Sequence, residues 1–396
     1  MTAAVDIVTF GCRLNYVDSE RLLREARAGA QSERVIVNTC AVTAEATRQA
    51  RQAIRRLKRE RPTAEIVVAG CAARIDPQSF ATMDGVTRVL TEPGETRAGS
   101  AAEGQTRAFL AVQNGCDHSC TFCIIPLGRG PSRSIAPGEV VAEARRLIES
   151  GKREIVLTGV DLTSYAAEGV TLGGLVRKLL RELPQLERLR LSSIDCIEAD
   201  AALFDCMAAE PRLMPHLHLS LQSGDDLILK RMKRRHSRTD AIRLCAELRE
   251  ARPDIVFGAD FITGFPTETE DMFARTLALV EQCGLTHLHV FPYSPRPGTP
   301  AALMPRVNGA LAKERAARLR AAGEAALIRH LDAQIGKTLR VLTEKGGMAR
   351  ADDFTLIRTP GAEAGRMLEM RVTGHDGKAL NGVYSAFDRQ ESLRRA

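Results

Sequence analysis

Three cysteines lie close together in one polar stretch of the chain, at Cys116, Cys120 and Cys123. Their spacing is C-x3-C-x2-C, so this loop supplies three thiolates and no fourth. A structural zinc ion takes four ligands and usually draws them from paired motifs. Three soft thiolates instead suit an iron–sulfur cubane in which one iron keeps an open position for a cofactor. Half of a zinc site, or three cysteines of an ordinary core, is the alternative interpretation.

Three further cysteines follow the first three strands that the hydrophobic pattern predicts. The predicted strands are 6–10, 34–38 and 65–69, and the predicted helices between them are 15–28 and 44–60. Because single helices join these strands, we expect a parallel sheet with right-handed crossovers. Cys12, Cys40 and Cys71 lie just past the strand ends, and the carboxyl ends of parallel strands share one edge, where ligands bind. The pattern therefore predicts a second metal cluster at this edge.

Repeated strand–helix units follow a looser segment at 92–107, which we expect to be a linker. The predicted strands are 109–112, 154–157, 189–192, 216–219, 255–258 and 288–291. Six such units predict a partial, open barrel with its site at the carboxyl ends of the strands. Most of these ends carry polar residues or glycine, as in Thr158-Gly159 and Gln222-Ser223-Gly224.

The pattern changes again near Gly336, after a basic helical stretch at 306–330. Short strands separated by glycine-rich turns are expected at 338–342, 354–357 and 367–372, which suits a small antiparallel β-barrel. We therefore expect an α/β protein of three domains. They are an open parallel α/β sheet at 1–98, a partial (βα)6 barrel at 105–335 and a small antiparallel β-barrel at 336–396.

Composition excludes some classes of protein and permits others. No apolar run approaches the roughly 18 residues of a membrane span, and the N-terminal residues lead directly into a predicted strand, so we expect neither a membrane segment nor a signal peptide. Ten cysteines in such a chain indicate reduced, metal-binding thiols in the cytoplasm. A net charge of +7 permits a polyanionic partner. Aromatic residues make up only 4% of the chain, so base stacking is not the expected way of binding nucleic acid.

The motifs together resemble those of the methylthiotransferase family of radical S-adenosylmethionine (SAM) enzymes, over essentially the whole chain. Thr-Phe-Gly-Cys-Arg-Leu-Asn at 9–15, Asn-Thr-Cys at 38–40 and Ala-Gly-Cys at 69–71 are similar to the cluster motifs of its first domain. The cysteine loop at 115–126, followed by Arg-Gly-Pro-Ser-Arg-Ser at 129–134, resembles its radical SAM signature. The last domain is similar to the TRAM module, which holds RNA or, in one branch, a ribosomal protein.

This resemblance implies two 4Fe–4S clusters and SAM as cofactors. Cys116, Cys120 and Cys123 would hold the cluster that binds SAM, and Cys12, Cys40 and Cys71 would hold the second cluster. Around SAM, Phe122 would cover the adenine, and Gly159 would let the backbone approach closely. Ser220 and Gln222, two apart on one strand, would share a face and hydrogen-bond the ribose or methionine. No protein acid or base is identified.

The substrate that the resemblance implies is tRNA. His-Val-Phe-Pro-Tyr-Ser-Pro-Arg-Pro-Gly-Thr-Pro at 289–300 looks most like the branch that converts N6-threonylcarbamoyladenosine (t6A) at position 37, in the anticodon stem-loop, to its 2-methylthio derivative. Alternatives are methylthiolation of N6-isopentenyladenosine or of a ribosomal protein. From another class, a nucleic-acid-binding protein that holds zinc remains open. A flavodoxin or ferredoxin of the cytoplasm is the expected electron donor.

Two basic runs and the last domain are candidates for holding tRNA. One run lies on the helix at 44–60 and continues to Arg61, and the other is 230–235. Phosphate contacts from lysine and arginine supply most of the affinity for nucleic acid that does not depend on sequence. We also expect 336–396 to dock tRNA and to take no part in the radical step.

Overall fold

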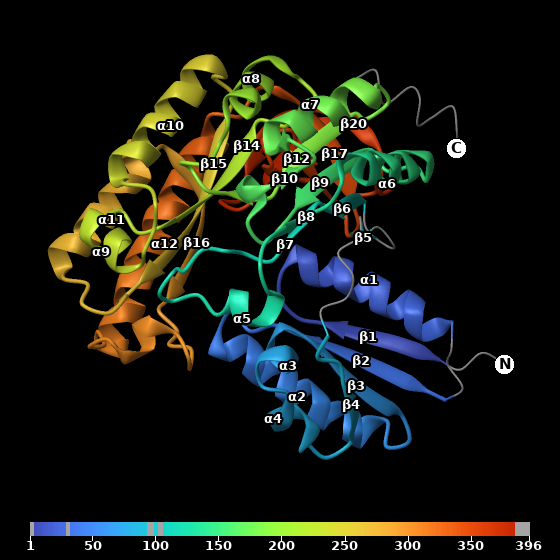
Figure 1. Ribbon diagram of the computed structural model, residues 1–396. Coiled ribbons are helices and arrows are strands. Elements are labelled where there is room, and N and C mark those ends of the chain that lie inside the picture. The colour runs from blue at the N-terminus through green and yellow to red at the C-terminus, as the bar shows by residue number, and fades with distance from the viewer. Residues whose placement is uncertain (1–3, 29–31, 93–98, 102–105, 385–396) are drawn as a thin grey trace.

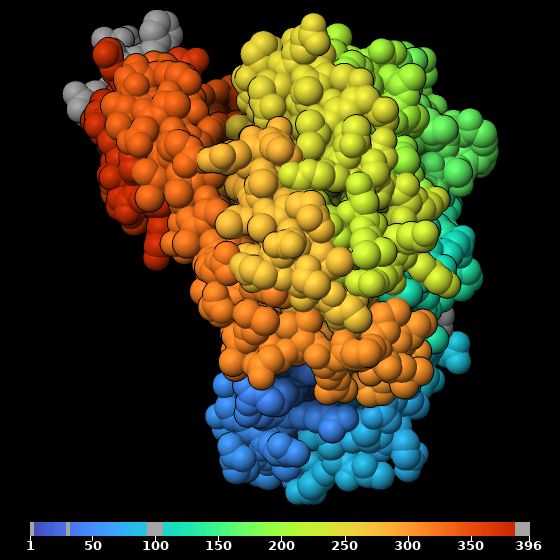
Figure 2. Space-filling model, turned by 90° about the vertical axis from the view of Figure 1, so that its left-hand side faces the viewer, coloured from blue at the N-terminus to red at the C-terminus, as the bar shows by residue number. Residues whose placement is uncertain are grey.

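The computed structural model describes residues 4–28, 32–92, 99–101 and 106–384. Its parts are an N-terminal α/β sheet, a central half-open barrel and a small C-terminal β-barrel, as the sequence predicts. The N-terminal sheet lies at one end of the central barrel, and the C-terminal β-barrel lies away from it (Figures 1 and 2). No helix within the described ranges is long and apolar enough to cross a membrane.

The N-terminal part is a four-stranded parallel sheet in the order β1-β2-β3-β4. Its elements are β1 (Val5–Thr9), α1 (Arg13–Arg27), β2 (Arg34–Thr39), α2 (Ala44–Glu60), β3 (Glu65–Gly70), α3 (Cys71–Ile75), α4 (Pro77–Ala81) and β4 (Val86–Val89). The three predicted strands are confirmed, and β4 is an edge strand that the short pattern did not reveal. The α2 helix begins at a Thr43 cap, which accepts the N–H of Ala46, and buries the face that carries Ile54 and Leu57.

The central barrel contains all six predicted parallel strands, divided between two sheets. The strands are β6 (Arg107–Ala111), β9 (Glu154–Thr158), β12 (Arg188–Leu191), β14 (His216–Gln222), β15 (Val256–Thr263) and β16 (Leu285–Pro292). The sheets are β12-β9-β6-β5 and β13-β14-β15-β16, where β13 (Ser193–Ile194) follows β12 after one residue. The predicted linker contains β5 (Gly99–Ala101), which pairs antiparallel with β6; residues 93–98 and 102–105 lie outside the described part.

Helices cover the outside of this barrel (Figure 1). They are α6 (Pro137–Glu149), α7 (Leu172–Glu182), α8 (Ala201–Ala209), α9 (Asp226–Arg231), α10 (Arg238–Ala251), α11 (Glu270–Gln282) and α12 (Gly309–Asp332). Shorter elements are β7 (Gln113–Asn114), α5 (Ile125–Arg129), β8 (Arg133–Ser134), β10 (Ala166–Ala167) and β11 (Val170–Thr171). Leucine, isoleucine and valine from strands and helices form one continuous core between them.

The C-terminal part is a closed barrel in the order β17-β18-β19-β21-β20. Its strands are β17 (Thr338–Glu344), β18 (Met348–Ala351), β19 (Leu356–Arg358), β20 (Met367–His375) and β21 (Leu380–Tyr384). Four pairs are antiparallel, as expected, but β19 and β21 run parallel. The sequence pattern did not reveal β18 and β21. Both strands are short, β18 has only one large apolar residue, and Asn381 and Gly382 interrupt β21.

A buried charge cluster marks the amino ends of β9 and β12. The Glu154 carboxylate lies 2.9 Å from Arg188 Nε and 3.0 Å from Arg190 Nε, and all three side chains are buried. Burial alone would raise the pKa of Glu154, but Arg190, Arg188 and Arg107 outweigh it and lower that pKa to about 2. The carboxylate therefore stays ionised inside the protein.

The C-terminal barrel closes this end of the central barrel through the last residues of β18 and the turn that follows them. Arg188 donates to the carbonyl oxygens of Arg350, at 3.2 Å, and Ala351, at 2.9 Å, and Arg190 donates to that of Asp352, at 3.1 Å. In the same turn, Phe354 stacks on His216 with ring centroids 4.8 Å apart. The segment 336–396, which we expect to dock tRNA, therefore also has a structural role, because its backbone accepts hydrogen bonds from buried arginines of the central barrel.

Candidate functional site

The C-x3-C-x2-C loop lies between β7 and α5, at the carboxyl ends of the barrel strands. All three of its cysteines line one pocket, which also contains Asp161, Asp195 and Arg234. Cys116 Sγ accepts the backbone N–H of His118 at 3.4 Å, and Cys120 Sγ accepts Nη1–H of Arg234 at 3.7 Å. Such N–H groups stabilise a thiolate, so the loop is suited to ligating a metal.

The residues expected around SAM come together at this pocket, with one exception. Phe122, Ser220 and Gln222 line it. Gly159 does not, although the next two residues do. A Cβ at Gly159 would lie 2.8 Å from Gln113 Oε1. The glycine is therefore explained by the close approach of Gln113, whose oxygen accepts the N–H groups of residues 160 and 161.

Two further side chains, Arg234 and Asp161, line this pocket and were not predicted there from the sequence. Arg234 is 8% exposed and bonds Asp195 Oδ2 and the carbonyl oxygen of Ser220, both at 2.7 Å. Asp161 lies 3.8 Å from Cys116 Sγ and 3.1 Å from His118 Nε2. His118 is thus half-buried, beside the acidic groups Asp161 and Glu198. A basic residue inside the run 230–235 was the only signal for Arg234.

The second set of cysteines converges at the carboxyl edge of the N-terminal sheet. Cys12 precedes α1, Cys40 follows β2 directly, and Cys71 opens α3. Their thiols are close enough to influence one another electrostatically. A Cβ at Gly11, whose φ is +100°, would lie 2.8 Å from Cys40 Sγ, so the turn before Cys12 packs against Cys40.

Arg129 belongs to the central barrel but enters this second site. It is 2% exposed, lies 2.9 Å from Asp18 Oδ2 and donates to Asn15 Oδ1. Burial disfavours its charge, but Cys71, Asp18 and Cys12 outweigh burial and raise its pKa. Asn15 in turn donates to the carbonyl oxygens of Phe10 and Thr39, and so fixes the loops that carry the cysteines.

The chemistry of the two cysteine sets fits iron–sulfur clusters. None of the six thiols is in a disulfide. Burial raises the pKa of Cys40 and Cys123 to about 11 each, and that of Cys116 to about 12. A thiolate at such positions needs a neighbouring positive charge, which metal ions supply.

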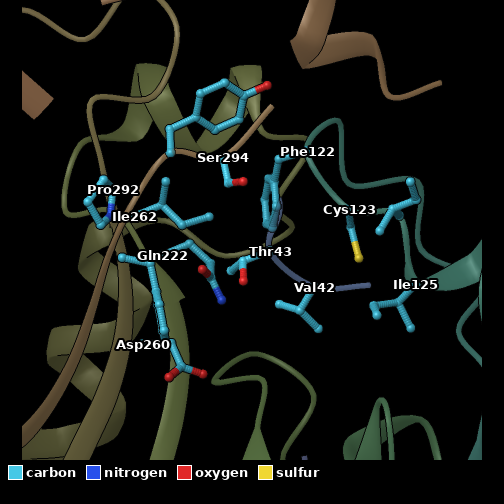
Figure 3. A pocket seen from close by; sticks show the side chains of 13 residues that line it. Val42, Thr43, Phe122, Cys123, Ile125, Gln222, Asp260, Ile262, Pro292 and Ser294 are labelled. Carbon is cyan, nitrogen blue, oxygen red and sulfur yellow. The ribbon is translucent and has the colours of Figure 1, made fainter. Parts of the chain in front are cut away.

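A second pocket lies between the two cysteine sets. Val42 and Thr43, just after Cys40, form one part of it, and the segment 122–125 forms another. Gln222, Asp260 and Ile262 from the barrel strands face them, with Cys123 and Ile125 on the opposite side (Figure 3). Hydrogen bonds hold the parts together: Ala44 N–H donates to Ser294 Oγ at 3.2 Å, and Arg296 donates to Thr47 Oγ1 at 3.3 Å.

Gln222 is shared by both pockets and has an unusual backbone. Its φ is +66°, a left-handed conformation that residues other than glycine rarely adopt. The pairing register of β14 shifts between Leu219 and Gln222. Since such strain clusters at functional sites, we infer that the bend serves to place this amide between the pockets.

In the two basic runs proposed as phosphate contacts, several cations are paired with acidic residues or buried. In the first run, Arg48, Arg51, Arg56 and Arg61 pair with acidic residues. Arg55 and Arg59 are exposed and have no ion-pair partner among the residues described. In the second run, Arg234 is buried against Cys120, so the prediction that this run is a phosphate-binding surface is wrong for that residue.

Family models match two parts of the chain. One described as Radical SAM superfamily matches residues 110–280, and one described as Uncharacterized protein family UPF0004 matches residues 4–91. The fold agrees with the first match: a cobalamin-binding radical SAM methyltransferase, TsrM from Kitasatospora setae, has a TM-score of 0.57 at 15% identity, covering 76% of this chain and 77% of its own. The central barrel is therefore that of a radical SAM enzyme.

Relatives with similar sequences narrow the class. The threonylcarbamoyladenosine tRNA methylthiotransferase MtaB of Rickettsia prowazekii is 43% identical, covering 89% of this chain and 90% of its own. Its counterpart in Thermotoga maritima is 34% identical, over 88% and 89%. A tRNA-2-methylthio-N(6)-dimethylallyladenosine synthase of Cereibacter sphaeroides is 36% identical, over 95% and 97%. The chain belongs to the methylthiotransferase family of radical SAM enzymes.

Proposed function

We propose that this protein is a tRNA methylthiotransferase that converts t6A at position 37 to its 2-methylthio derivative. The 43% identical relative is named as a threonylcarbamoyladenosine tRNA methylthiotransferase, which supports t6A as the substrate. The relatives named for dimethylallyladenosine reach 36% identity. Within the fold, the observation that carries the proposal is the pocket bordered by Cys123 on one side and by the segment after Cys40 on the other.

We further propose how the domains divide the work. The domain at 1–98 holds one 4Fe–4S cluster through Cys12, Cys40 and Cys71. The domain at 105–335 holds the other through Cys116, Cys120 and Cys123, with Phe122, Ser220 and Gln222 around SAM. Gly159 acts indirectly, because it leaves room for Gln113, which holds the pocket-lining residues 160 and 161. The domain at 336–396 holds RNA. With both clusters bound, SAM and the clusters supply radical formation and the sulfur to be transferred.

The chain's own residues position the reactants and keep water away. Phe122, Ile124 and Ile262 line the pocket between the cysteine sets with apolar surface, which protects a reactive radical from solvent. Arg234 links Cys120 to Asp195 and to the Ser220 backbone, and so fixes the ligand loop against β14. Gln222 offers an amide donor and acceptor at the point where both pockets meet.

The proposed partners follow from the same chemistry. The tRNA would present its anticodon stem-loop at this pocket, and a flavodoxin or ferredoxin would supply electrons. Both would meet the protein in the cytoplasm.

Mass spectrometry of tRNA nucleosides from a deletion strain tests the substrate. We expect the 2-methylthio derivative of t6A to disappear and t6A itself to remain. If the 2-methylthio derivative of isopentenyladenosine is lost instead, the substrate is N6-isopentenyladenosine. If the tRNA nucleosides are unchanged, a ribosomal protein becomes the candidate substrate. Anaerobically purified protein should carry iron and absorb near 400 nm; zinc alone would support the zinc-holding alternative.

A further inference from the structure

Two histidines and an aspartate form a cluster on three adjacent strands of the central barrel. His218 on β14 and His289 on β16 lie on either side of Asp260 on β15. Asp260 Oδ1 is 3.0 Å from His218 Nε2 and 3.1 Å from His289 Nδ1. The two rings are 4.5 Å apart, and Asp260 and His289 are paired in register.

This cluster borders the pocket between the cysteine sets. Asp260 lines that pocket, next to Gln222 (Figure 3). His289 precedes Phe291 by two residues on the same strand, and Phe291 also lines the pocket. Of the residues that β14, β15 and β16 contribute to its wall, Asp260 and Gln222 carry the polar side chains.

The hydrogen bonds of the cluster leave one ring nitrogen of His289 free for a ligand. Burial would raise the pKa of Asp260, but its bonds from His218 and His289 outweigh burial and hold that pKa well below its usual range. His289 uses Nδ1 for this contact, is 62% exposed, and within the described chain has no partner at Nε2. An imidazole held by a carboxylate in this way is oriented to donate from its second nitrogen when protonated.

A metal ion is a less fitting occupant. The three ligand atoms lie within 4.8 Å of one another. However, His218 and His289 both bond the same oxygen of Asp260, so these nitrogens satisfy the carboxylate rather than point at a shared empty centre.

We propose that His289, held by Asp260, donates from Nε2 to the carboxylate of the threonylcarbamoyl group, and that this cluster selects t6A over isopentenyladenosine. The inference rests on the proposed function and names the residues that read the N6 substituent. The threonylcarbamoyl group carries a carboxylate, a hydroxyl and urea N–H groups, which match the donor of His289 and the acceptor of Asp260. An isopentenyl group would bury these polar groups without partners, and sites built for hydrogen bonds reject such analogues strongly.

The test measures discrimination, with full-length protein that carries its clusters. Three anticodon stem-loop RNAs are compared in binding: one with t6A, one with isopentenyladenosine and one with unmodified adenosine. We expect wild-type protein to bind the t6A RNA more tightly than the isopentenyladenosine RNA. In His289→Leu the ratio of these two affinities should fall at least about tenfold, while the affinity for unmodified RNA stays the same. Iron content and the visible spectrum report that the variant is intact.

A matched control is His375→Leu. His375 also pairs with an aspartate, Asp332, at 3.0 Å, but it lies in the C-terminal barrel. This control should keep the wild-type preference. If His289→Leu also keeps it, the inference is overturned and the proposed function stands. If wild-type protein shows no preference for t6A, the proposed function fails, and the inference fails with it.

Discussion

At the scale of single residues, each cysteine set is accompanied by one buried arginine paired with an aspartate. Arg129 pairs with Asp18 beside Cys71, and Arg234 pairs with Asp195 beside Cys120. Both guanidinium groups are charged donors close to sulfur in a poorly hydrated environment. Such donors favour thiolates and offset part of the negative charge of a thiolate-bound cluster.

Replacing one cysteine of each set in turn should distinguish the roles of the two clusters. We expect Cys120→Ala to lose about half of the bound iron and all SAM cleavage, because a three-thiolate site loses a ligand. Cys40→Ala should also lose about half of the iron but still form some 5′-deoxyadenosine, and no methylthio product. Iron analysis and quantification of 5′-deoxyadenosine check both. Normal 5′-deoxyadenosine formation by Cys120→Ala would contradict the assignment.

Glu154 should make the free energy of unfolding depend on pH in the acidic range. Its pKa is lowered to about 2 in the folded state, below roughly 4.3 in an unfolded chain. The stabilisation is therefore complete above the unfolded value and is lost as pH falls toward the folded value. At pH 7, Glu154→Gln should be less stable by about 3–5 kcal/mol, because Arg188 and Arg190 lose their buried partner.

Denaturant unfolding between pH 7 and pH 2 measures this difference. The gap between wild type and Glu154→Gln should narrow as pH falls below about 4. Glu247→Gln, an exposed change on α10, is the control and should follow wild type throughout. A gap that stays constant over this range would show that the carboxylate charge is not responsible.

At the level of secondary-structure elements, the turn between β18 and β19 packs into the amino-terminal end of the central barrel and closes it. Phe354 stacks on His216, and the guanidinium groups of Arg350 and Arg190 lie 4.2 Å and 5.0 Å from its ring centroid. Its φ of +76° is unusual for a residue other than glycine, so packing holds the turn in a strained conformation. The C-terminal barrel thus completes the core next to Glu154.

Phe354→Ala should loosen this contact. We expect a loss of about 3 kcal/mol in the free energy of unfolding, from the lost ring contacts and the cavity left behind. Thermal unfolding measures it, and Phe204→Ala on α8, a partly buried phenylalanine packed against the main core, offers a comparison. Faster proteolysis of the linkage near residue 336 in Phe354→Ala, but not in Phe204→Ala, should accompany the loss. An unchanged melting temperature in Phe354→Ala would show that packing of this turn does not stabilise the central barrel.

At the scale of the whole molecule, positive charge is distributed over several surfaces. The net charge is +7, but most arginines of α2 are neutralised by acidic neighbours, and Arg234 is buried at the cysteine loop. Arg55 and Arg59 remain exposed on the helix that begins beside the pocket. They are therefore the best candidates on α2 for contacts with tRNA phosphates.

The double variant Arg55→Ala/Arg59→Ala should bind tRNA more weakly and with less salt dependence. Each lost phosphate contact should reduce the slope of log K against log salt by about 1. Binding at several salt concentrations measures this. Arg145→Ala, an exposed change on α6, should leave the slope unchanged. If the double variant keeps the wild-type slope, tRNA is held by other surfaces, such as the C-terminal barrel.

Both cysteine sets and the order of the three parts of the chain could be predicted from the spacing and pattern of residues. These are local properties: thiolate spacing limits the kind of metal site, and alternation of apolar runs with helical patterns predicts parallel strands whose ends share an edge. The strands β4, β18 and β21 were not predicted because each is only four or five residues long and is interrupted by polar residues or glycine. The prediction that the whole run at 230–235 contacts phosphate is wrong for Arg234, which is buried, because the pattern of charges in a sequence does not reveal burial.

Only the tertiary structure decided how the parts act together. The pocket between the two cysteine sets combines Val42, Cys123 and Asp260 from separate segments of the chain. Arg129 reaches from the central barrel into the N-terminal site, and the turn at 350–354 closes the far end of the barrel. Such contacts join residues more than 100 positions apart. They depend on how complete elements pack, which no local pattern of residues encodes.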